Sequence, residues 1–133
     1  MSTLDHLRPE GLPHPPTYTQ VVVASGKRTI YVAGQIAVDA HGALVGGNDL
    51  AAQTTQVMRN IGLALAAAGA TYADIVKLTT FVVNYQPEHR AIIGAARSAF
   101  FTNGKPPAST LVGVTALAMP EWLIEIEAVA VVD

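Results

Sequence analysis

Two carboxylates close to the C-terminal end are the clearest candidates for chemistry. The segment Leu123-Ile124-Glu125-Ile126-Glu127-Ala128 alternates acidic and apolar residues. In an extended strand, this alternation places Glu125 and Glu127 on one face and the isoleucines on the other. One interpretation, which the segment alone favours, is an edge strand with two solvated carboxylates. In the other, Glu125 lines a cleft, where it handles protons or orients a water molecule.

The usual cofactor and metal motifs do not occur. Gly46-Gly47 lacks the Gly-Lys-Ser/Thr of a phosphate loop, and no Gly-x-Gly-x-x-Gly is present. The four histidines lie in segments expected to be an arm, a turn and a helix start, without the spacing of metal ligands. Tyr18, considered alone, is more typical of a packed amphipathic aromatic than of a ligand contact. We therefore expect neither a metal nor a cofactor.

Size and composition indicate one folded domain that associates with copies of itself. The 133 residues suit a single core, residues 1–133, with 1–17 as an extended proline-rich arm. Half of the residues are hydrophobic and 14% are charged, so a monomer would expose apolar surface. We expect a homo-oligomer.

The charge pattern and the apolar runs limit the partners. The net charge is −2 and Lys27-Arg28 is the single adjacent basic pair, which argues against nucleic-acid binding. No apolar run reaches the roughly 18 residues of a membrane span. The N-terminal segment does not resemble a signal peptide, so the expected location is the cytoplasm.

Hydrophobic periodicity predicts an α+β chain with the order β-β-β-α-β-α-β-β. We expect helices at 49–68 and 87–101, the first with Gln53 outside its buried stripe. The expected strands are 20–24, 29–33, 36–38, 74–83, 109–117 and 123–132, the first two forming a hairpin. These elements suggest a six-stranded mixed sheet with both helices on one face, leaving the other face to a partner.

In their order and spacing, several short segments together resemble the reactive-intermediate deaminase family, RidA, formerly called YjgF or endoribonuclease L-PSP. The similarity extends from about Tyr18 to Val132. The segments are Thr17-Tyr18-Thr19-Gln20, Val32-Ala33-Gly34-Gln35-Ile36, the helix containing residues 53–65, Asp74-Ile75-Val76-Lys77, Phe100-Phe101, Pro107-Ala108-Ser109-Thr110 and Ile124-Glu125-Ile126-Glu127-Ala128.

The resemblance implies a chorismate-mutase-like fold and a homotrimer, in which three sheets line a central barrel and clefts lie between subunits. Active family members hydrolyse small imines and enamines, such as 2-aminoacrylate, to a 2-oxo acid and ammonia without a cofactor. By position, the cleft here would contain Tyr18, Gly34, Ser109, the backbone of Leu111, and Glu125, which would position the attacking water.

Two positions depart from the family pattern. Family members that hydrolyse 2-imino acids have an arginine after the Pro-Ala pair, where this chain has Ser109, and an asparagine where it has Gly94. Serine cannot form the charged bidentate fork that arginine offers a carboxylate. The substrate is therefore expected to differ from 2-aminoacrylate.

Two hypotheses about function remain open. One is an imine deaminase whose substrate lacks a carboxylate, or whose carboxylate is held by another group such as Arg97 or Arg28. The other is a non-catalytic trimer that binds a small metabolite or a partner protein. A ribonuclease role is disfavoured by the absence of a basic cluster.

Overall fold

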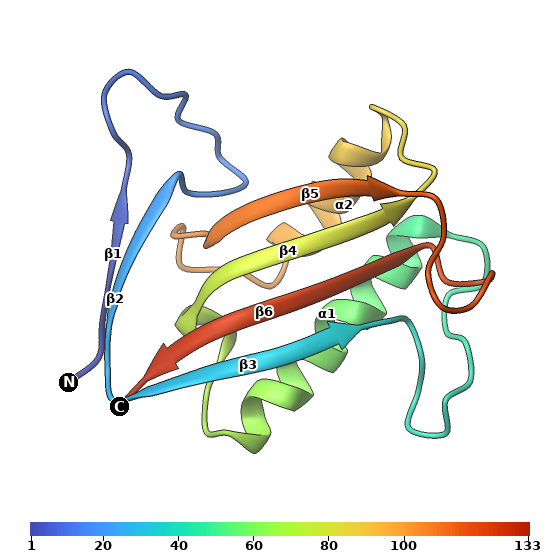
Figure 1. Cartoon of the computed structure of the whole chain (residues 1–133), viewed down its shortest axis with the longest axis horizontal. Coiled ribbons are helices and arrows are strands. Elements are labelled where there is room, and N and C mark those ends of the chain that lie inside the picture. The colour runs from blue at the N-terminus through green and yellow to red at the C-terminus, as the bar shows by residue number, and fades with distance from the viewer.

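The computed structural model describes residues 1–133 and contains six strands and two α-helices (Figure 1). The order of elements reads β-β-β-α-β-α-β-β, as predicted, but the first three strands are not the three that were predicted. The elements are β1 (Thr3–Leu7), β2 (Val21–Ser25), β3 (Arg28–Gln35), α1 (Leu50–Ala67), a short 3₁₀ helix (Tyr72–Asp74), β4 (Ile75–Val83), α2 (His89–Ser98), β5 (Ala108–Val114) and β6 (Ile124–Val132).

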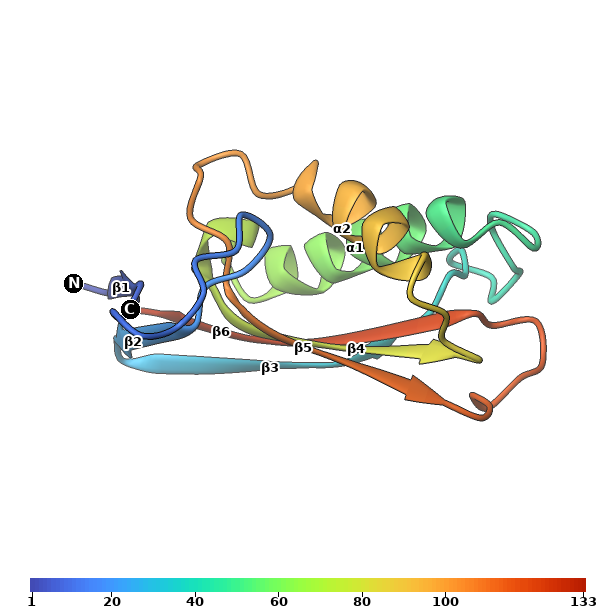
Figure 2. The same ribbon diagram turned by 90° about the horizontal axis from the view of Figure 1, so that it is seen from above.

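Four strands form a mixed sheet in the order β3-β6-β4-β5. β6 is antiparallel to both of its neighbours, whereas β4 and β5 run parallel. Both helices lie on one face of this sheet, and the other face is open (Figure 2). The predicted α+β class, with two helices on one face of a mixed sheet, is confirmed. The six strands, however, divide into this sheet and a separate two-stranded one.

The N-terminal pairing differs from the prediction. Residues 3–7 of the expected arm form β1, which pairs antiparallel with β2, and β3 pairs with β6. The predicted hairpin between residues 20–24 and 29–33, which correspond to β2 and β3, is therefore wrong. The prolines begin only at Pro9, so residues 3–7 keep every N–H that strand pairing needs. The predicted strand at 36–38 is also absent, since Val38 forms only an isolated bridge with Leu44.

Helix α1 follows the predicted stripe and caps. Val57, Ile61 and Leu65 are buried, the Asp49 carboxylate accepts a hydrogen bond from Ala52 N at 3.1 Å, and Gly69 has the positive φ of a helix end.

Gln53, predicted to lie off the buried stripe, is completely buried. Its amide nitrogen donates to Gly47 O at 2.8 Å and to Glu121 O at 2.9 Å, and its oxygen accepts from Leu123 N at 2.9 Å. These bonds satisfy the buried amide and hold two loops against α1.

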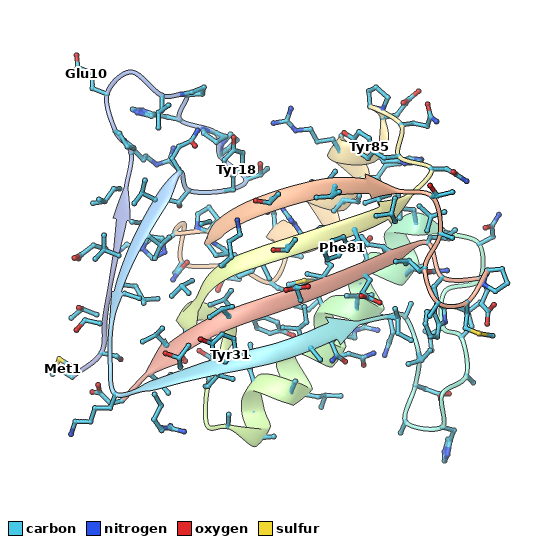
Figure 3. All side chains as sticks on the ribbon, viewed as in Figure 1. Met1, Glu10, Tyr18, Tyr31, Phe81 and Tyr85 are labelled. Carbon is cyan, nitrogen blue, oxygen red and sulfur yellow. The ribbon has the colours of Figure 1, made fainter.

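The open face of the sheet carries apolar side chains. Tyr31 on β3 is 80% exposed and Val112 on β5 is 38% exposed. Figure 3 labels Tyr31 and Phe81 in the view onto this face. No helix of the chain has the length and hydropathy needed to cross a membrane.

Candidate functional site

A cavity of about 340 Å³ lies between α2, β5 and the segment that precedes β2. Three of the predicted site residues, Tyr18, Ser109 and Leu111, line it together. The complete lining is Thr17, Tyr18, Tyr85, Arg90, Ile93, Gly94, Arg97, Ser109, Leu111 and Gly113.

The register of β5 explains why alternate residues face this cavity. β5 is parallel to β4, with Ser109 opposite Leu78 and Leu111 opposite Thr80. Leu78 and Thr80 are buried beneath the helices, so Ser109 and Leu111 point to the helix side at the edge of the sheet.

Tyr18 is held beside β5 by its neighbour Thr19. The Thr19 backbone N–H donates to Pro107 O at 3.0 Å, and its buried hydroxyl donates to Pro106 O. Figure 3 shows Tyr18 close to β5. The proline pair before β5 therefore fixes this wall of the cavity.

Arg97 places a positive charge within the cavity lining. It projects from α2 with only 7% of its surface exposed, and its Nη1 donates to Thr80 Oγ1 and Ser109 Oγ, each at 3.1 Å. No carboxylate pairs with it, since the one ion pair of the chain joins the N-terminal amine to Asp133. Burial lowers the pKa of Arg97, although arginine remains charged at neutral pH.

The other arginine considered as a cleft residue lies elsewhere. Arg28 donates to Asp133 O at 2.9 Å and to Ala68 O at 3.2 Å, so it joins β3 to the end of α1 and to the C-terminus. It does not line the cavity.

Gly34 and Glu125 meet on the opposite, open face of the sheet. Ile124 and Ile126 are buried under the helices, which leaves Glu125 half-buried and Glu127 exposed on the open face. A Cβ atom on Gly34 would lie 2.7 Å from Cδ of Glu125, so any side chain at this position would displace the carboxylate from where it lies. β6 is a central strand, and the edge-strand interpretation of this segment is therefore wrong.

Within a single chain, the five predicted site residues therefore form two separate groups. Tyr18, Ser109 and Leu111 lie on the helix side, and Gly34 and Glu125 lie on the open side. Sequence reasoning missed Thr80, Tyr85 and Arg90. The sequence could have indicated Thr80, because it lies between Leu78 and Val82 at the two-residue spacing of the β4 side chains that face the helices.

Comparison with known proteins gives consistent matches over most of the chain. The family model described as "Endoribonuclease L-PSP" matches residues 13–132. The 2-iminobutanoate/2-iminopropanoate deaminase of Rattus norvegicus is 36% identical over 117 residues, covering 86% of this chain and 79% of that protein. The enzyme of the same name from Salmonella typhimurium is 38% identical over 104 residues, covering 77% and 78%. A RutC family protein of Synechocystis is 32% identical over 115 residues, covering 86% and 85%.

Solved structures share the fold. A protein of unknown function from Yersinia pestis, described as the conserved Rid protein family member YyfB, superposes with a TM-score of 0.92 at 46% identity, covering 96% of this chain and 98% of that one. The YjgF gene product of E. coli gives a TM-score of 0.69 at 37% identity, covering 79% and 81%. The similarity therefore includes both helices and the mixed sheet.

Proposed function

The chain belongs to the RidA (YjgF, endoribonuclease L-PSP) family, and from this we propose that it hydrolyses imines or enamines to a carbonyl compound and ammonia. The observation that carries the proposal is the position of Glu125 beside Gly34, where the missing side chain leaves room for a half-buried carboxylate on the open face of the sheet. Two relatives of more than 35% identity are named as imine deaminases.

The complete site forms between subunits of a homotrimer with a chorismate-mutase-like barrel. Within one chain, the cavity and Glu125 lie on opposite faces of the sheet, so neither group alone can hold and hydrolyse a substrate. If the edge strand β5 of one subunit lies against the open face of the next, the cavity faces the neighbour's Glu125. The exposed apolar residues Tyr31 and Val112 support burial of this face, because such surface usually marks an interface.

The proposed reaction needs water, one carboxylate and a held substrate. Glu125 accepts a hydrogen bond from a water molecule and orients it toward the imine carbon. As the C–O bond forms, the carboxylate takes one proton from the water and passes it to the nitrogen, which gives a carbinolamine. The carboxylate then takes the hydroxyl proton and delivers it to the amine, and the C–N bond breaks as the C=O bond forms and NH₃ leaves. The sum is C=N–H plus H₂O giving C=O plus NH₃. Tyr18 and the Leu111 backbone hold the substrate in the cavity.

Ser109 separates this chain from family members that hydrolyse 2-aminoacrylate. A serine at this position carries no charge for a substrate carboxylate, so we expect a different imine as substrate. The same feature supports the alternative function, a trimer that binds a metabolite or a partner without turnover. RNA cleavage fits the chain poorly, because ten acidic residues outnumber eight basic ones and the basic residues form no cluster. A cytoplasmic location suits a substrate that arises in metabolism.

Glu125→Gln tests the proposed catalysis, with Glu127→Gln as its matched control on the same strand. Imines are generated in situ by amino-acid or amine oxidases, and ammonia release above the spontaneous rate is measured. We expect Glu125→Gln to abolish turnover and Glu127→Gln to retain it. Loss of activity in Glu127→Gln alone would show that the wrong carboxylate has been assigned. A wild type that binds metabolites without hydrolysing any imine would support the alternative function.

Sedimentation equilibrium at micromolar concentration tests the assembly. The proposed trimer requires three times the 13.9 kDa chain mass, for wild type and for both variants. A stable monomer would contradict the intersubunit site.

A further inference from the structure

Arg97 is a buried cation without a counter-ion. Buried charges in proteins are normally paired, because removing an ion from water costs several kcal/mol. Here the partners of the guanidinium are two neutral hydroxyls, those of Thr80 and Ser109, and no acidic side chain lines the cavity. An anion that enters the cavity would supply the missing charge.

One edge of the Arg97 guanidinium is free to hold such an anion. Both hydrogen bonds of the guanidinium come from Nη1, and Nε and Nη2 donate to no protein atom. Neither nitrogen is fully enclosed, since the one enclosed side-chain nitrogen or oxygen without a partner is Nδ1 of His6. The N–H groups of the Nε–Nη2 edge are parallel, and this fork matches the two oxygens of a carboxylate.

The cavity also has room for more than a charged group. Its volume of about 340 Å³ lies within the range in which proteins bury drug-sized ligands. A second, shallower hollow on the outer side of α2 shares Thr17, Arg90 and Gly94 with it. Gly94, which lines both hollows, has no side chain to separate them. Ile93 and Leu111 provide apolar walls.

We propose that the cavity binds a carboxylate larger than a three-carbon acid, with its oxygens on the Nε–Nη2 edge of Arg97 and its apolar body extending past Gly94. This assignment rests on the proposed function, since it names the substrate class of the same cavity. Ser109 then acts as a positioning residue, because its hydroxyl accepts from Nη1 and holds the guanidinium with its free edge open. Binding of an unreactive acid does not require hydrolysis, so it can be measured separately.

Calorimetric titration of the wild-type assembly with hexanoate, hexanamide, acetate and inorganic phosphate tests the ligand class. Hexanoate and hexanamide share the same chain and differ in charge. We expect hexanoate to bind at least about tenfold more tightly than hexanamide, since a charge-assisted hydrogen bond contributes that much or more. We also expect it to bind more tightly than acetate, because the longer chain buries more apolar surface. Equal binding of hexanamide, or tighter binding of phosphate than of hexanoate, would overturn the proposal.

Arginine variants test the residue assignment. Arg97→Gln removes the charge, Arg97→Lys keeps the charge without the fork, and Arg59→Gln removes an exposed arginine of α1 that does not line the cavity. Hexanoate affinity should fall about 10- to 100-fold in Arg97→Gln, less in Arg97→Lys, and not at all in Arg59→Gln. An unchanged affinity in Arg97→Lys together with a loss in Arg59→Gln would show a general charge effect and refute the assignment.

The two proposals can fail separately. Should Arg97→Gln not fold, the lysine variant and the hexanoate–hexanamide pair in the wild type still decide the assignment. Carboxylate binding through Arg97 without turnover of any imine would leave this inference standing and remove the proposed hydrolysis. Turnover of imines with no preference for carboxylates would support the proposed hydrolysis and refute carboxylate binding through Arg97.

Discussion

Replacing Gly34 by alanine perturbs the proposed catalytic carboxylate with a single methyl group. The added Cβ would lie 2.7 Å from Cδ and 2.9 Å from Cγ of Glu125, whereas an ordinary contact begins at 3.4 Å. Gly34 does not have a positive φ, so alanine can adopt the backbone conformation. The methyl group therefore forces the Glu125 carboxylate to move by at least about 0.7 Å.

The expected effect on stability is small and the expected effect on turnover is large. Losing a strand glycine stabilises by about 0.5–1 kcal/mol, and an off-rotamer glutamate costs about 0.5–1.5 kcal/mol, so the two nearly cancel. A displacement of about 1 Å in a reacting group can cost 10²-fold in rate. We expect Gly34→Ala to lower imine turnover about 10- to 100-fold, with the free energy of unfolding changed by less than about 1 kcal/mol.

Urea unfolding and ammonia release measure the two effects, and a double-mutant cycle connects them. If Gly34→Ala acts through the carboxylate, it should scarcely lower whatever trace of turnover Glu125→Gln still shows. Full turnover in a folded Gly34→Ala protein would refute the reasoning, because Glu125 would then tolerate displacement. Additive losses in the cycle would show that the two residues act independently.

Three further variants probe the fold. Gln53→Leu should lower the free energy of unfolding by about 3 kcal/mol, measured in urea, because it removes three hydrogen bonds to backbone groups, each contributing about 1 kcal/mol. Tyr72→Phe removes a 2.8 Å bond to Met58 O and should cost about 1 kcal/mol at neutral pH. Burial raises the pKa of Tyr72 above 10.0, so the unfolded chain releases this proton first and wild-type stability falls above that pH. The difference between wild type and Tyr72→Phe should therefore shrink in unfolding curves recorded above pH 10, and a constant difference would contradict the assignment. Gly94→Ala should stabilise by about 0.5–1 kcal/mol in thermal or urea unfolding, because its Cβ would meet only Thr17 Cγ2, at 3.6 Å.

The elements with strong periodicity were predictable from the sequence. Helix α1 has its apolar stripe, an aspartate cap and a terminal glycine, and β4 and β6 alternate buried and outward-facing residues. Pairing of the first strands was not predictable, because residues 21–25 have the same strand propensity whichever partner they meet. Contacts distant in sequence decide between β1 and β3.

The site residues were predictable as a set, and their faces were not. Alternation along the strand places Glu125 and Ile124 on different faces of the sheet, but it does not distinguish a central strand from an edge strand. Arg97 was a candidate cation by residue type, and its orientation depends on Thr80 and Ser109 from two other strands. Gln53 was misassigned because polar residues are usually exposed unless bonded, and its three bonds come from distant loops.

The hydrogen bond between Arg97 and Ser109 makes the residue type at one of these positions depend on the residue type at the other. Arg97 reaches Ser109 Oγ at 3.1 Å because residue 109 is small. An arginine at 109 would bring a second guanidinium to the same buried place, and two unpaired cations there would repel each other. Related chains should therefore carry arginine at one of these positions and a small or neutral residue at the other. A classification of relatives that reads position 109 alone would record a neutral serine there and would miss the cation that α2 brings to the same place.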